Sequence, residues 1–145
     1  MDQVLLFNVG QEVYAMGITH LVEIGHARRI QPASTPTPGA VGEILSRGMR
    51  APVVDLRRLF GTDAPPWTPD QPVVVMAPPR GPVGLLVDRV QEIQPPRGSV
   101  RTLPPRLLPE TRNVYLGVLH RPDRLFLVLD EARVLQVASA QEGQS

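Results

Sequence analysis

Apolar residues along this chain gather in short runs that end at turn-forming residues. The first run covers Val4–Val9, stops at Gly10-Gln11 and resumes over Val13–Ile18 with apolar side chains in alternation. Two such runs around a tight turn predict a β-hairpin. Three more paired runs share this form: Ile44–Leu56 around Arg47-Gly48, Val73–Val87 around Arg80-Gly81, and Leu116–Leu129 around Arg121-Pro122-Asp123. The pattern predicts a mainly β fold.

Two carboxylates and the prolines mark where the strands end. Asp55 precedes an amphipathic stretch to Phe60, and Asp130 precedes one to Leu135, so each aspartate is expected to cap a short helical turn. Proline is excluded from helix interiors and central strands. Of the 17 prolines, 12 lie in three connections, which are Gln31–Gly39, Asp63–Pro72 and Pro95–Pro109.

The two halves of the chain repeat one another. A shift of 69 positions lays Val4–Phe7 on Val73–Met76 and Ile18–Ile24 on Val87–Ile93, and a shift of 75 lays Gly42–Phe60 on Gly117–Leu135 without a gap. Alternating apolar positions alone could align any two β-rich halves, but here the elements also recur in the same order. About 70 residues of short strands protect their edges best by curling into a barrel. The repeat therefore predicts two small β-barrels that share one core.

The length suits one domain over residues 1–145. We expect one subdomain to take its strands from about 13–60 and the second from about 73–129. The N-terminal strand 4–9 and a C-terminal helical turn 130–137 are expected to join the two.

Composition narrows the class of partner. The 15 basic and 14 acidic residues give a net charge of +1, and there are only six aromatic residues. Nucleic-acid binders carry a basic stripe with stacking aromatics, so nucleic acid is not an expected partner. With no cysteine and no apolar run of about 18 residues, the sequence predicts no disulfide framework, no membrane insertion and a cytoplasmic protein.

The residues of common catalytic motifs are missing. The three histidines lie far apart and form no i, i+4 metal pair, no serine sits in a Gly-x-Ser-x-Gly elbow, and the chain has no lysine for a phosphate loop. We therefore expect no catalytic, metal or cofactor site. Two alternatives stay open: a small enzyme that uses scattered Asp, Glu and His, and an SH3-like module that binds proline-rich peptides.

Several segments, in this order, carry a family resemblance: Leu6-Phe7-x-x-Gly10, Leu21-Val22-Glu23-Ile24, Gly42-x-x-x-x-Arg47-Gly48, Ala51-Pro52-Val53-Val54-Asp55-Leu56 and Val83-Gly84-Leu85-Leu86-Val87-Asp88. From Val4 to about Leu135 the chain resembles the CheW-like chemotaxis coupling proteins. The resemblance implies two five-stranded, SH3-like barrels around a shared core. It also implies a non-enzymatic adaptor that couples the cytoplasmic tip of a chemoreceptor to the regulatory domain of a CheA-type histidine kinase, recruited to membrane-associated receptor arrays.

The resemblance also implies a protein-binding set. Arg47, followed by Gly48, matches the arginine of the family's Asn-Leu-Arg-Gly motif, and Leu21, Glu23 and Ile24 match its Val-Gln-Glu-Ile segment. An arginine fork can hold a carboxylate, and leucine or isoleucine gives an interface its apolar centre. In the alternative interpretation, Leu21 and Ile24 belong to the core and Glu23 is a solvated charge.

Three departures from the family pattern bear on the partner. Leu45-Ser46 replaces the family's Asn-Leu before Arg47, and Gly17 replaces an acidic residue after the tyrosine strand. Met49-Arg50 interrupts an apolar strand start, so we include Arg50 in the expected protein-binding set. Such changes also fit a coupling protein of an accessory pathway, for example one tied to pili or gliding.

Overall fold

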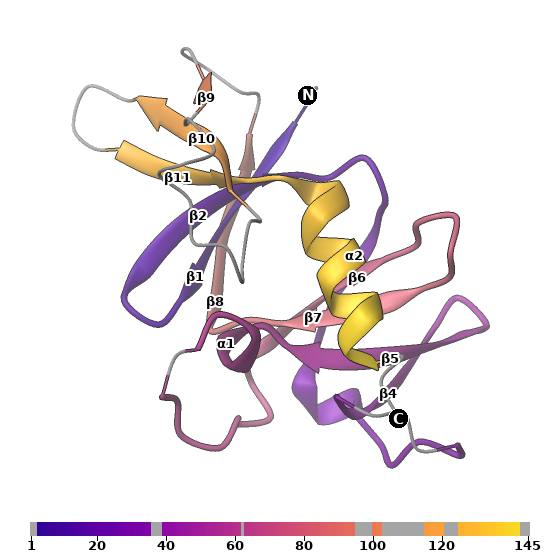
Figure 1. Ribbon diagram of the computed structural model, residues 1–145. Coiled ribbons are helices and arrows are strands. Elements are labelled where there is room, and N and C mark those ends of the chain that lie inside the picture. The colour runs from indigo at the N-terminus through magenta and orange to yellow at the C-terminus, as the bar shows by residue number, and fades with distance from the viewer. Residues whose placement is uncertain are drawn as a thin grey trace.

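Two β-sheets and a C-terminal helix make up the protein in a computed structural model, which describes residues 3–35, 39–61, 63–94, 100–102, 115–120 and 125–142. The predicted turn Arg121-Pro122-Asp123 and most of the Pro95–Pro109 connection lie outside these residues. Sheet A has the strand order β8-β1-β2-β11-β10-β9, and sheet B has the order β3-β6-β7-β5-β4 (Figure 1). The mainly β class is confirmed.

The strands begin and end close to the predicted apolar runs. In sheet A they are β1 (Val4–Val9), β2 (Glu12–Gly17), β8 (Arg89–Gln94), β9 (Val100–Thr102), β10 (Tyr115–His120) and β11 (Leu125–Leu129). In sheet B they are β3 (Leu21–His26), β4 (Ala40–Ser46), β5 (Met49–Asp55), β6 (Pro72–Met76) and β7 (Val83–Leu86). A 3-10 turn, η1 (Ala27–Arg29), follows β3.

Alternation along the strands supplies three apolar cores. One face of sheet A buries Val4, Leu6, Ala15, Leu119, Phe126 and Val128 in a core of its own. One face of sheet B does the same with Ala27, Ile44, Ala51, Val53, Val73, Val75 and Leu86. The opposite faces meet in a third core that includes Leu5, Phe7, Met16, Val74, Met76 and Leu85. The shared core is thus confirmed. In β1 the residues Val4–Phe7, and in β6 the residues Val73–Met76, are unbroken apolar runs because both faces of these strands are buried there.

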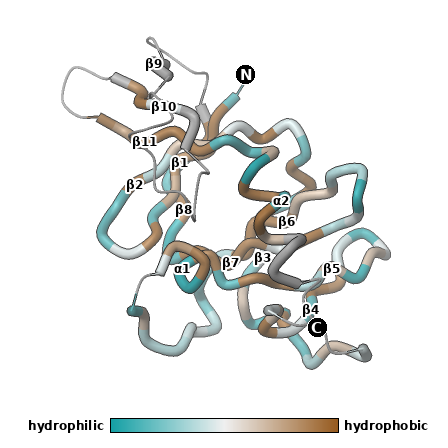
Figure 2. The backbone as a smooth tube through the Cα atoms, in the orientation of Figure 1, coloured by the Kyte–Doolittle hydropathy of each residue, from teal (hydrophilic) through white to brown (hydrophobic). Residues whose placement is uncertain are grey.

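The hydropathy of the backbone follows this arrangement. In Figure 2 hydrophobic stretches run along the strands and α2, whereas hydrophilic stretches lie mainly on the outward turns. Burial of apolar surface is the main stabilising contribution in such a fold.

Strand registers confirm the internal repeat residue by residue. The parallel pair β5–β7 places Val53 opposite Gly84, and the parallel pair β11–β2 places Val128 opposite Ala15, which are the counterpart positions in the other half. The bulge between Ala40 and Gly42 likewise recurs between Tyr115 and Gly117. A chance match of apolar runs does not reproduce register and bulges, so the two halves are copies of one unit.

The halves exchange their first hairpins. Hairpin β1–β2 of the first half joins sheet A, and hairpin β6–β7 of the second half joins sheet B (Figure 1). This hydrogen bonding differs from the expected division into strands of about 13–60 and about 73–129, because each sheet contains strands from both halves. A hairpin that stays with its own half and one that crosses over have the same local pattern, so alternation does not distinguish them.

Both helices begin at the predicted aspartates. In α1 (Leu56–Leu59) Asp55 Oδ1 accepts a hydrogen bond from the Arg57 amide at 3.0 Å, and in α2 (Glu131–Glu142) Asp130 Oδ1 accepts one from the Ala132 amide at 3.1 Å. Helix α2 is longer than the expected turn 130–137. It continues because Val134, Leu135 and Ala138 lie on one face and are buried in the shared core.

Candidate partner-binding site

The turn between β4 and β5 has an unusual backbone conformation. Arg47 and Gly48 form it with φ of 49° and 80°, and Ser46 and Met49 close it as a strand pair. Positive φ at both central residues suits Asn-Gly, not a long side chain. Among the described residues Arg47 is the one non-glycine residue with positive φ. Its left-handed conformation holds the exposed guanidinium at the tip of the hairpin, and such strain concentrates at functional sites.

Glu23 lies beside this turn and is held from two sides. Its Oε1 accepts a hydrogen bond from Arg29 Nη1 at 2.6 Å, and its Oε2 accepts one from the Ser46 hydroxyl. Arg29 Nη2 also donates to the Leu45 carbonyl at 2.6 Å. We call Glu23, Arg29, Ser46 and the Leu45 carbonyl the Glu23 clasp.

The Glu23 clasp spans the two edges of sheet B. Glu23 belongs to edge strand β3, and Leu45 and Ser46 belong to edge strand β4. No backbone ladder joins β3 to β4 in the described part of the chain, and a single bridge pairs Gln31 with Glu43 after η1. Side chains thus complete the closure that a barrel would make with backbone hydrogen bonds, and they protect two sheet edges from other pairing.

Gly25 makes room for the Glu23 clasp. A Cβ at position 25 would lie 2.8 Å from Arg29 Nη1, so a larger residue would displace the guanidinium that holds Glu23. The hydrogen bonds from Arg29 and Ser46, with the nearby charges of Arg29 and Arg47, lower the pKa of Glu23 below its ordinary value. The carboxylate is therefore ionised and engaged within the molecule, in contrast to the solvated charge of the alternative interpretation.

Stability should depend on Glu23 in a pH-dependent way. We expect Glu23→Gln to lower the free energy of unfolding by about 1 kcal/mol at pH 7, because the clasp loses a charge-assisted pair. A carboxylate with a lowered pKa in the folded state stabilises that state above its unfolded pKa of about 4.3, and this contribution disappears as pH falls through the folded-state value. Urea unfolding of both proteins from pH 7 down to pH 3 measures the difference. A difference that stays constant with pH would contradict the clasp.

The outer face of the β4–β5 hairpin carries an apolar side chain among cations. Leu45 is 51% exposed, pairs in register with Arg50 and lies two residues before Arg47. Arg50 Nη1 donates to the Ser34 hydroxyl at 2.6 Å, and this hydroxyl donates to Glu43 at 3.3 Å. We call Leu45, Arg47 and Arg50 the β4–β5 tip. Leu45 was not among the predicted contacts, although its place between buried Ile44 and buried Ser46 indicates an outward side chain.

The structure divides the predicted binding residues into two groups. Arg47, Gly48 and Arg50 lie at or next to the β4–β5 tip, and Glu23 connects to it through the clasp. Leu21 and Ile24 are half-buried and pack against the shared core. Their packing is what the core interpretation expects of them.

A second ionic cluster lies in the interior. Arg57 is 2% exposed, and its Nη2 and Nε each lie 3.0 Å from a carboxylate oxygen of Asp55, while Nη1 lies 3.6 Å from Asp88 Oδ1. Asp88 Oδ2 accepts a hydrogen bond from the Gly10 amide at 2.6 Å. Hydrogen bonding to Asp55 raises the pKa of Arg57. Because these groups satisfy one another, they connect the β1–β2 turn, α1 and the residue before β8.

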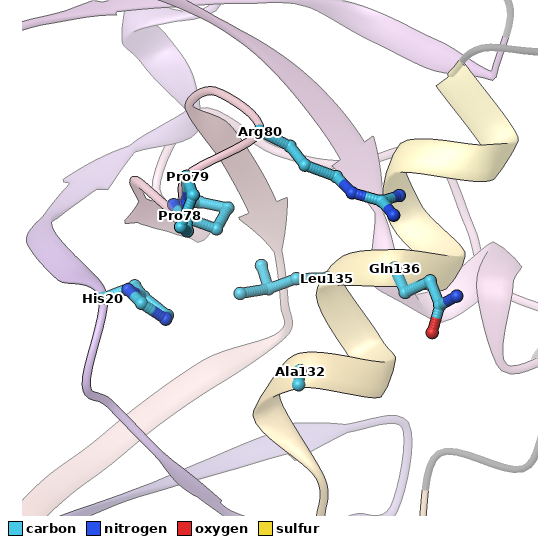
Figure 3. A pocket seen from close by; sticks show the side chains of 7 residues that line it. All are labelled: His20, Pro78, Pro79, Arg80, Ala132, Leu135 and Gln136. Atoms are coloured by element: carbon cyan, nitrogen blue, oxygen red, sulfur yellow. The ribbon is translucent and has the colours of Figure 1, made fainter.

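One surface pocket of about 340 Å³ lies beside α2. Its walls are His20 before β3, Pro78–Arg80 from the β6–β7 turn, and Ala132, Leu135 and Gln136 on α2. Figure 3 shows Leu135 pointing into the space between His20 and Arg80, with Pro78 and Pro79 along one wall. The lining is mainly apolar and includes one cationic side chain.

Two searches of the described residues bear on the class of site. Groups of three or more His, Cys, Asp or Glu side chains that could hold a metal ion do not occur in this part of the chain. None of its helices is both long and apolar enough to cross a membrane.

Comparison with known proteins gives one family and one fold. A family model described as the CheW-like domain matches residues 3–139. The crystal structure of the scaffolding protein TtCheW from Thermoanaerobacter tengcongensis is similar, with a TM-score of 0.72, 22% sequence identity and 88% of each chain covered. No curated protein matches the chain. The structural likeness extends over both sheets and supports the pair of SH3-like units.

Proposed function

The chain belongs to the family of CheW-like domains, and from this premise we propose that it is a non-enzymatic adaptor in a chemotaxis or chemotaxis-like signalling array. In this proposal it couples the cytoplasmic tip of a chemoreceptor to the regulatory domain of a CheA-type histidine kinase. It acts in the cytoplasm at membrane-associated receptor arrays, and it needs no cofactor. Two moderate interfaces reinforce each other there, because the array raises the effective concentration of each partner.

The observation that carries the proposal is the exposed Arg47, whose backbone is in the left-handed conformation, near the exposed Leu45. Arginine at the centre of an interface, next to an apolar side chain, is a frequent source of binding energy. A carboxylate on the partner would pair with the guanidinium, and the leucine would supply the apolar contact. Glu23 contributes by holding β4 in place, directly through Ser46 and indirectly through Arg29, which also donates to the Leu45 carbonyl.

The β4–β5 tip also favours a second candidate within the same class, a scaffold of an accessory pathway such as pili or gliding. Where the family pattern has Asn-Leu, this chain has Leu45-Ser46, and Ser46 is fully buried with its hydroxyl on Glu23. The exposed side chain of the pair is therefore apolar. This surface fits a partner that offers an apolar contact to Leu45.

Replacing Arg47 should separate binding from folding. We expect Arg47→Asn to weaken binding to the kinase regulatory domain or to the receptor fragment about tenfold, because the guanidinium is lost. The free energy of unfolding should stay equal or rise, since Asn suits the positive φ of this turn. Calorimetric titration and urea unfolding measure the two effects.

Arg58→Asn is the matched control, because Arg58 has a 77% exposed side chain on α1 and the same charge is removed. It should leave binding unchanged. A large loss of stability with intact binding in Arg47→Asn would contradict the proposed role of Arg47. If the unaltered chain binds neither the kinase regulatory domain nor the receptor fragment from the same organism, the adaptor function itself is wrong.

A further inference from the structure

The pocket beside α2 has a counterpart in the first half of the chain. There the corresponding space is filled by a side chain. The shifts that align the halves relate Ala132 to Arg57 and Leu135 to Phe60 on the helices, and Pro79 to Gly10 in the turns. Each segment that lines the pocket is therefore the counterpart of a segment around Arg57. The two sites share a backbone plan and differ in their side chains.

In the first half a buried arginine occupies this place. The Arg57 side chain joins Asp55 at 3.0 Å and Asp88 at 3.6 Å, and Asp88 in turn holds the Gly10 amide. Helix α1, the β1–β2 turn and the residue before β8 are thus connected through one guanidinium. Nothing is left to bind there.

In the second half the side chain at this position ends at the Cβ of Ala132. Glu131 holds the neighbouring loop instead, since its two carboxylate oxygens accept hydrogen bonds from the amides of Thr19 at 3.1 Å and His20 at 3.0 Å. The His20 carbonyl accepts a further bond from the Ala77 amide at 2.9 Å. The walls are therefore held without an ion pair like that of Arg57 between them. Preformed pockets of roughly 300 Å³ and more are typical of ligand sites.

The lining specifies the chemistry of the occupant. Pro78, Leu135 and Ala132 present apolar surface, and the exposed Arg80 reaches over the pocket toward α2 (Figure 3). Within the described part of the chain Arg80 has no ion pair. Both carboxylate oxygens of the nearby Glu131 accept hydrogen bonds from the loop amides. An apolar group beside a carboxylate complements these walls.

We propose that this pocket binds an apolar side chain next to an acidic residue on a partner protein, with the apolar group in the space that corresponds to Arg57 and the carboxylate on Arg80. The identity of the occupant as a protein segment rests on the proposed adaptor function. The complementary chemistry of the pocket does not depend on it.

A pair of small probes tests the chemistry on the full chain. Phenylacetate carries an apolar ring with a carboxylate, and benzylamine carries the same ring with an ammonium group. In NMR titrations we expect phenylacetate to shift the amide resonances of His20, Arg80 and Gln136 with saturation, and benzylamine to shift them at most weakly. Equal shifts with both probes, or none that saturate, would overturn the proposed complementarity.

Two variants locate the binding. Ala132→Leu should abolish the phenylacetate shifts by filling the pocket, and Arg80→Gln should weaken phenylacetate binding about two- to fivefold, as for the loss of an exposed ion pair. Arg58→Gln removes the same charge from the other half and should change nothing. Thermal unfolding of each variant shows that it is folded. Undiminished binding to folded Ala132→Leu would place the probe elsewhere and overturn the site.

A second set of binding measurements uses the two proposed protein partners, the kinase regulatory domain and the receptor fragment. We expect Ala132→Leu to weaken binding to one of them at least fivefold. If the variant loses phenylacetate but binds both proteins normally, a protein occupant is ruled out and the adaptor function stands. If the unaltered chain binds neither protein, the adaptor function fails, a protein occupant falls with it, and the phenylacetate result still decides the chemistry of the pocket.

Discussion

Arg57→Ala is expected to lower the free energy of unfolding by about 3–5 kcal/mol, the cost of breaking a buried ion pair by removing one partner. The Arg57 side chain is only 3% exposed, and the Asp55 side chain with which it pairs is equally buried. Without the guanidinium, the buried Asp55 carboxyl loses the cation that bonds both of its oxygens. Asp88, which also holds the Gly10 amide, loses its cation. Against a typical stability of about 5–15 kcal/mol, this loss is large.

Arg58→Ala provides the control for this prediction. Arg58 is adjacent, lies 4.0 Å from the same carboxylate and has a side chain that is 77% exposed. Exposed pairs contribute little, so its removal should change the free energy of unfolding by less than about 1 kcal/mol. Urea unfolding of the two variants at pH 7 gives both values. Similar losses in both would show that the Asp55–Arg57–Asp88 cluster does not stabilise the fold as its burial indicates.

Gly42→Ala should cost about 3 kcal/mol of unfolding free energy. Gly42 lies at the bulge of β4 with φ of 157°, where a Cβ would approach the Gln31 carbonyl oxygen to 2.8 Å and Ile30 Cγ2 to 2.6 Å. Overpacking typically costs about 1–3 kcal/mol, and here one obstacle is backbone that pairs with Glu43. The substitution should therefore weaken the bridge that helps to close sheet B.

Gly48→Ala is the control, because a Cβ there meets no neighbouring atom and the steric part of the effect is absent. At Gly48 φ is 80°, and no atom lies within 4 Å of a Cβ built there. Its cost should be limited to the left-handed backbone conformation, about 1–2 kcal/mol. Urea denaturation midpoints with unchanged slopes would rank the variants. If Gly42→Ala is no worse than Gly48→Ala, the close approach at the bulge is relieved by movement of the backbone.

The broken symmetry of the repeat explains how one unit, used twice, offers different surfaces. The buried side chain of Arg57 fills the site in the first half. Its counterpart Ala132 has a short side chain and leaves the pocket beside α2 open. Gly84 and Ala15 are counterparts in equivalent parallel pairs, so the sheets tolerate small differences in packing. The proposed adaptor function requires two different faces. Changes at a few positions on one backbone plan provide them.

Much of the local structure follows from the sequence alone. The alternation in Val13–Ile18 and the Gly10-Gln11 turn predict the first hairpin, and Asp55 and Asp130 predict where the helices begin, because strand periodicity and capping act over a few residues. The internal repeat, with its shifts of 69 and 75 positions, is also readable from the sequence and agrees with the strand registers.

The tertiary structure decided which hairpin belongs to which sheet and what Glu23 does. β1 and β6 have the same pattern wherever they pair, so their exchange between halves depends on contacts between residues far apart in the chain, such as Leu5 and Ile93. From the sequence alone, Glu23 is interpreted as a surface charge. In the folded protein β3 and β4 form the two edges of one sheet, and this arrangement brings Glu23 to Arg29 and Ser46. The pocket beside α2 arises in the same way. Periodicity reports the face on which a side chain lies, but only the completed packing determines what that face meets.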